Sequence, residues 1–149
     1  MESLVERLGE LEEILEGQPR RPLCGDSDWA RDVSPLAGVY AIWDTQSGKP
    51  VYVVETSGLL ARMGDLGRTQ NHTFRRTVRK KFKFRATSKN EAALNALLAT
   101  RFEIAFLPVD FGRAELEEYL VLRWNQTLYN KPALRLKRSA QYEWVRDAV

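Results

Sequence analysis

The chain has few of the residues that crosslink small extracellular domains or bind zinc. Its 149 residues include one cysteine, Cys24, and one histidine, His72. One cysteine cannot form an intrachain disulfide, and the two residues alone cannot complete a zinc site. No apolar run is long enough to span a membrane, and the acidic, amphipathic residues 1–17 are unlike a signal or transit peptide. We therefore expect a cytoplasmic protein that makes no use of the membrane.

What is present is enough for one ordinary domain. Hydrophobic residues make up 44% of the chain and charged residues 29%, which at this length suffices to bury a core without crosslinks. We divide the chain into an N-terminal helix and connector (1–33), a central domain (34–132) and a basic, aromatic C-terminal extension (133–149). No internal repeat or low-complexity segment interrupts this order.

The N-terminal region is expected to form an amphipathic helix. Its leucines recur at alternating spacings of four and three residues, at Leu4, Leu8, Leu11 and Leu15. Two interpretations stay open at this point. The helix packs on the core of its own chain, or it pairs with a second copy in a homodimer, because two heptads are too few to decide.

The central domain begins with a predicted β-hairpin. Residues 39–43 and 51–54 are rich in β-branched and aromatic side chains and flank a turn that contains Gly48 and Pro50. Thr56-Ser-Gly then indicates the start of a helix. Residues 102–109 predict a third strand, and helices are predicted over 71–82, 90–100 and 113–125. The expected fold is α+β, a small three-stranded antiparallel sheet flanked by helices.

Several short pieces of this domain occur in a recognisable order. They are Gly38-Val-Tyr40, Tyr52-Val-Val54, Arg62 ten residues after the second tyrosine, and Glu118 followed by Tyr129-Asn130. In this order and spacing the chain resembles the GIY-YIG nuclease superfamily over about residues 34–132. The resemblance implies a GIY-YIG-like fold and a metal-dependent endonuclease that cleaves DNA.

The resemblance also implies a role for each matching residue. Glu118 would be the sole protein ligand of a Mg²⁺ or Mn²⁺ ion, and Arg62 would clamp the phosphate. Tyr40 and Tyr52 would align or deprotonate the attacking water, and Asn130 would tie the C-terminal piece to the site. The chemistry agrees, because Mg²⁺ keeps most of its waters beside one or two carboxylates and the arginine fork matches phosphate.

Two positions depart from the family pattern. Val54 stands where the family has glycine, and Leu66 stands where many members have a histidine or tyrosine that works with the catalytic tyrosine. A phenol has a pKa near 10, so little tyrosinate exists at neutral pH without a nearby base. His72 is our candidate for that base, the alternative being a surface or helix-cap residue, and Glu55 is a weaker candidate.

Positive charge is concentrated in the middle of the chain. Between Arg62 and Lys89 there are ten basic residues and one acidic residue, a bias that favours contact with nucleic acid. A helix there would turn Phe74, Val78 and Phe82 inward and its basic residues toward DNA. The candidate phosphate-binding residues are Arg68, Arg75, Arg76, Arg79, Lys80 and Lys81.

Two other functions remain open from the sequence. A catalytically weakened domain that keeps the basic face would be a nucleic-acid-binding module, which Val54 and Leu66 motivate. A dimeric interaction or regulatory domain would instead use the N-terminal leucine helix.

Overall fold

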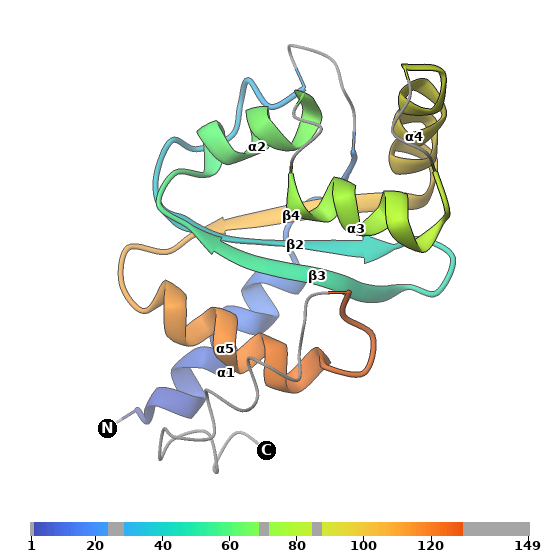
Figure 1. The fold of residues 1–149 in the computed structure, drawn as a ribbon. Coiled ribbons are helices and arrows are strands. Elements are labelled where there is room, and N and C mark those ends of the chain that lie inside the picture. The colour runs from blue at the N-terminus through green and yellow to red at the C-terminus, as the bar shows by residue number, and fades with distance from the viewer. Residues whose placement is uncertain (1, 24–28, 69–71, 85–87, 130–149) are drawn as a thin grey trace.

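The computed structural model describes residues 2–23, 29–68, 72–84 and 88–129 and has the predicted α+β fold (Figure 1). An antiparallel sheet has the strand order β1-β4-β2-β3. Its strands are β1 (Arg21–Pro22), β2 (Gly38–Asp44), β3 (Lys49–Thr56) and β4 (Phe102–Pro108). The three expected strands are β2, β3 and β4, and the two-residue β1 adds a short edge that we had predicted as connector.

Helices cover both faces of the sheet (Figure 1). On one face lie α2 (Leu59–Arg68), α3 (Thr73–Lys81) and α4 (Ser88–Arg101); on the other lie α1 (Leu4–Glu16) and α5 (Arg113–Trp124). Among the described residues, no helix is long and apolar enough to cross a membrane. Helix α2 continues through Gly64 and Gly67, although glycine is a poor helix former.

The central strand β2 divides the core into two clusters. All seven of its residues are buried, and side chains alternate between the faces of a strand. Tyr40 and Ile42 join the cluster under α2, α3 and α4, whereas Val39, Ala41 and Trp43 join the cluster with α1 and α5. Each face of β2 therefore packs against its own set of helices.

Gly38, the first residue of β2, is fixed by close packing. A Cβ atom there would lie 2.7 Å from Leu59 Cδ1 and closer still to the backbone carbonyl oxygen of Leu107. Since a backbone atom cannot move aside as a flexible side chain can, the position admits only hydrogen. The glycine of the first motif thus lets α2 and β4 approach β2 closely.

Gly38→Ala is therefore expected to destabilise the protein by about 3 kcal/mol, the upper part of the range for overpacking a core. Urea unfolding followed by circular dichroism measures the change in midpoint. Gly58→Ala is the matched control, because a Cβ there has no neighbour nearer than 3.9 Å, and its expected effect is within about 1 kcal/mol. Equal stability of Gly38→Ala and wild type would contradict the packing argument.

The N-terminal helix packs on the core of its own chain. A capping box between Ser3 and Glu6 starts α1, and Leu8 and Leu15 are buried in the cluster with α5 and β2. The interpretation that this helix packs on the core of its own chain is therefore confirmed for its buried face. Pairing of two copies through α1 stays a prediction.

Candidate active site

Four of the predicted site residues lie together on one face of the sheet. They are Tyr40 from β2, Tyr52 from β3, Arg62 from α2 and His72 at the start of α3, and we call them the tyrosine cluster. The Tyr40 hydroxyl oxygen lies 3.3 Å from His72 Nε2. The ring centroid of Tyr52 lies 6.2 Å from that of Tyr40 and 6.5 Å from that of His72. Residues separated by up to 32 positions in the sequence thus meet at one place.

The strand register brings the two tyrosines together. Tyr40 pairs with Val54 and Ile42 pairs with Tyr52, so the two phenols lie diagonally on one face, within reach of each other. Val54, the departure from the family's glycine, is half-buried and packs against the same hydrophobic cluster. A branched side chain is therefore accommodated beside the tyrosines.

Helix α2 is folded back onto the sheet and carries Arg62 to the tyrosines. The backbone N–H groups of Leu59 and Leu60 donate hydrogen bonds to the carbonyl oxygens of Leu36 and Ser34. Leu59 and Met63 are fully buried and fix the helix on the sheet. Arg62 lies beside the Tyr40 hydroxyl, and its positive charge favours the ionised phenol.

Burial of Tyr40 has a larger effect on its pKa than the charge of Arg62. It raises the pKa of Tyr40 well above its usual range, aided by the neighbouring Tyr52. Burial, followed by the positive charges of Arg62, Arg75 and Arg76, lowers the pKa of His72 to about 4. At neutral pH both groups are uncharged, so Arg62 gives the cluster a positive charge that suits an anionic ligand.

Helix α5 packs on the other face of the sheet, at the outer strand β3 (Figure 1). Glu118 is half-buried on α5. Its neighbour Glu117 is only 3% exposed, and its Oε2 accepts a hydrogen bond of 2.8 Å from the backbone N–H of Glu55. This carboxylate therefore ties α5 to β3, a contact that the sequence alone did not reveal.

Glu55, the weaker candidate base, faces away from the tyrosine cluster. Side chains alternate between the two faces of β3, and Tyr52 and Val54 share the face of the tyrosine cluster. Glu55 therefore lies on the opposite face, the one that α5 covers. There it forms an ion pair with Arg113, with a distance of 2.7 Å from Oε2 to Nε. The structure thus places Glu55 with α5 and excludes contact with Tyr40.

Beyond α5 the chain returns to the side of the tyrosines. Leu128 belongs to the cluster on the α5 face, whereas Tyr129 packs against the cluster on the other face. The Tyr129 N–H donates to the carbonyl oxygen of Val51 over 2.6 Å, and its ring stacks 6.5 Å from that of Phe74. The chain therefore crosses the outer edge of the sheet here. Asn130 is the next residue and lies outside the described residues.

Some of the predicted phosphate-binding residues have a structural role. Arg75 is 3% exposed, pairs with Glu91 and donates to Asn95 Oδ1 over 2.8 Å. Arg79 pairs with the other oxygen of Glu91 over 2.8 Å. Both arginines therefore share the single carboxylate of Glu91 on α4, and contact of either with DNA stays a prediction.

Three of the predicted phosphate-binding residues on α3 are exposed. Arg76, Lys80 and Lys81 are exposed, and Lys81 Nζ lies 4.6 Å from the ring centroid of Tyr129. The inward stripe of Phe74, Val78 and Phe82 is confirmed, since all three pack in the core cluster. Arg68 ends α2. We call Arg76, Lys80 and Lys81 the α3 basic face.

Among the described residues, no three histidine, cysteine, aspartate or glutamate side chains lie close enough together to hold a metal ion. The predicted ion would need only Glu118, with water and substrate oxygens as the other ligands. The Glu118 carboxylate would supply the hard oxygen donor that Mg²⁺ and Mn²⁺ prefer.

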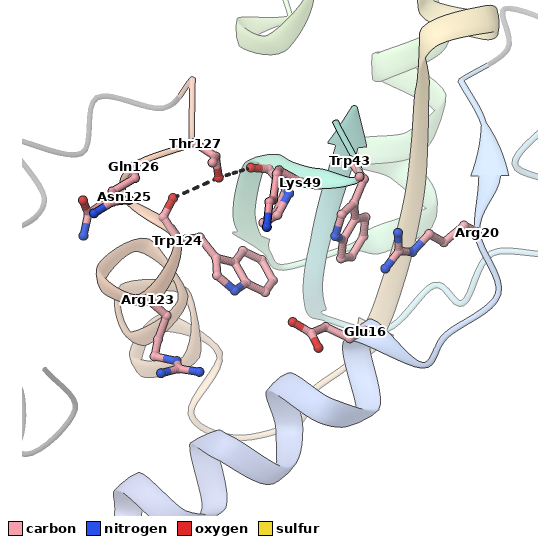
Figure 2. Close-up of a pocket in the computed structure, with 11 residues that line it drawn as sticks. Glu16, Arg20, Trp43, Lys49, Arg123, Trp124, Asn125, Gln126 and Thr127 are labelled. Atoms are coloured by element: carbon pink, nitrogen blue, oxygen red, sulfur yellow. Dashed lines mark hydrogen bonds between the residues drawn. The ribbon is translucent and has the colours of Figure 1, made fainter. Parts of the chain in front are cut away.

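A pocket of about 590 Å³ opens where α1 and α5 end beside the β2–β3 turn (Figure 2). Trp43 and Trp124 line it with ring centroids 6.0 Å apart, and the Arg20 guanidinium lies 3.9 Å over the Trp43 ring. Arg20 pairs with Glu103 and Arg123 with Glu12. Trp43 belongs to the α1 and α5 side of the core, so this pocket is separate from the tyrosine cluster.

Comparisons of the chain with models of protein families, with curated proteins and with solved structures found no match. The resemblance to GIY-YIG nucleases therefore depends on the motif residues of the sequence alone.

Proposed function

We propose that the protein is a cytoplasmic, metal-dependent endonuclease that hydrolyses DNA phosphodiester bonds by attack of water. One observation carries the proposal: Tyr40, Tyr52, Arg62 and His72 converge on one face of the sheet. A buried core of ordinary packing would fill this space with apolar side chains, whereas two phenols, a guanidinium and an imidazole suit a phosphate.

Each group would have a distinct task. Arg62 would hold the scissile phosphate and balance the charge of the transition state. Tyr40 and Tyr52 would orient the attacking water, and Glu118 on α5 would hold the metal. When bound, Mg²⁺ or Mn²⁺ would polarise the phosphate and lower the pKa of a coordinated water. Asn130, which follows Tyr129 in the sequence, would tie the C-terminal piece to the site.

The α3 basic face would bind the DNA backbone. Because phosphate contacts release counterions, Arg76→Ala and Lys80→Ala should each reduce the slope of log affinity against log salt by about 1. Filter retention of labelled duplex over a salt series measures this slope. Lys49→Ala is the control, since Lys49 is exposed at the start of β3 and lines the pocket on the α1 and α5 side, and it should leave the slope unchanged. An unchanged slope in the α3 variants would contradict the assignment.

A second candidate is a nucleic-acid-binding module without turnover. The observation that favours it is burial, because Tyr40 is 0% and Tyr52 3% exposed. A phosphate can reach these hydroxyls only if α2 or the start of α3 moves. A module that never makes this movement would retain DNA through the α3 basic face and leave it intact.

Nicking of supercoiled plasmid separates the two candidates. The nuclease predicts conversion to open circles in Mg²⁺ or Mn²⁺ and none in EDTA. The binding module predicts salt-sensitive retention of the plasmid with no conversion under any of these conditions.

A further inference from the structure

We propose that His72 is a positioning residue that donates a hydrogen bond from Nε2 to Tyr40, and that it is not the general base that removes the Tyr40 proton. The assignment concerns the tautomer of the imidazole and follows from its two contacts. Only its consequence for the reaction rate rests on the proposed nuclease activity.

The first contact fixes which nitrogen carries hydrogen. His72 is the N-cap of α3, and its Nδ1 accepts a hydrogen bond of 3.1 Å from the backbone N–H of Phe74. A ring nitrogen that accepts a hydrogen bond holds a lone pair and no proton. Since a neutral imidazole carries one N–H, the hydrogen must be on Nε2.

The second contact receives that hydrogen. Nε2 lies 3.3 Å from the Tyr40 hydroxyl oxygen, and His72 is 3% exposed, so water does not compete freely for either group. With a hydrogen on Nε2, this nitrogen can donate to Tyr40 but cannot accept its proton. The imidazole therefore stabilises a charged Tyr40 oxygen instead of creating it.

The surroundings keep the ring neutral. The groups that face it are the phenols of Tyr40 and Tyr52 and the cations Arg62, Arg75 and Arg76. A second proton on the ring would sit on Nδ1, break the cap of α3 and add a positive charge beside three arginines. Burial and these cations lower the pKa of His72 to about 4, so the tautomer persists across the neutral range.

The proton of Tyr40 then has another destination. The Tyr40 oxygen lies 3.3 Å from His72 Nε2, and Arg62 and Tyr52 also lie beside this phenol. Since His72 donates to the Tyr40 oxygen, the Tyr40 hydrogen points away from His72, and a proton that leaves Tyr40 passes to water and not to the imidazole. In the nuclease, the rate should therefore rise with pH as a phenol ionises, without an inflection near pH 6.5 from histidine.

The tautomer can be measured without any activity. Because His72 is the only histidine, a long-range ¹H–¹⁵N correlation spectrum of the full chain, labelled with ¹⁵N, reports this ring alone. The expected result is a protonated Nε2 and an unprotonated Nδ1 from pH 5 to pH 8. A protonated Nδ1, or titration of the ring near pH 6.5, would overturn the proposal.

Two substitutions separate the contacts in the nicking assay. His72→Asn keeps an oxygen near the Nδ1 position to cap α3 but removes the donor to Tyr40, whereas His72→Gln places an N–H donor near the Nε2 position. We expect His72→Gln to retain at least about tenfold more activity than His72→Asn, because an amide can replace a donor but not a base. If His72→Gln and His72→Asn lose nicking activity to the same extent, the proposal that His72 donates a hydrogen bond to Tyr40 is overturned. If wild type does not nick DNA, the proposed function fails while the spectrum still decides the tautomer.

Discussion

Replacing Glu118 by glutamine is expected to lower metal-dependent nicking by about a thousandfold or more, since a metal supplies several kcal/mol of transition-state stabilisation and each 1.36 kcal/mol is tenfold in rate. The amide has nearly the shape of the carboxylate but no charge, and in the proposed site this is the sole protein ligand of the ion. The nicking rate at saturating protein measures the loss. Retention of DNA at the α3 basic face should be unaffected.

Glu115→Gln is the matched control, because it removes an exposed carboxylate from the first turn of the same helix. It should nick at the wild-type rate. If Glu118→Gln is as active as Glu115→Gln, Glu118 is not the ligand. The buried Glu117, which accepts the N–H of Glu55, would then be the carboxylate of α5 to test next.

Arg62→Ala is expected to reduce nicking by about a hundredfold to a thousandfold, the cost of removing one preorganised donor to a developing negative charge. Two effects combine here. The phosphate loses its clamp, and Tyr40 loses the cation that opposes the rise of its pKa by burial.

Arg62→Lys distinguishes these effects. Lysine keeps the charge but lacks the planar fork that binds two phosphate oxygens. If the fork matters, Arg62→Lys should nick nearly as slowly as Arg62→Ala. If only the charge matters, most of the activity should return. Wild-type nicking by Arg62→Ala would contradict the role of Arg62 altogether.

The sequence was most informative where local pattern and packing agree. The hairpin of β2 and β3, the third long strand and the amphipathic helices follow from periodicity, turn residues and caps, and all three strands occur where they were expected. The glycines of α2 show the limit of such reasoning. Gly64 and Gly67 are poor helix formers, yet packing of Leu59 and Met63 on the sheet keeps the helix intact past them.

Long-range contacts could not be predicted in this way. Arg75 and Arg79 look like surface cations in the sequence, and only the position of α4 reveals that both pair with Glu91. The pairing of β1 with β4 and the hydrogen bond that the Glu55 N–H donates to Glu117 also join segments far apart in the sequence. His72 lies between these cases, because a cap role was foreseen but its second contact, with Tyr40, depends on how α3 packs on the sheet.

The central claim is that the tyrosine cluster and Glu118 together hydrolyse DNA. The most direct test is the single-turnover rate of nicking of supercoiled plasmid in Mg²⁺, with protein in excess and retention of the same plasmid measured in parallel. We predict that wild type nicks the plasmid, that EDTA stops it, and that Glu118→Gln retains the plasmid without nicking it. Retention by wild type with no nicking in Mg²⁺ or Mn²⁺ would contradict the claim and identify the protein as a nucleic-acid-binding module.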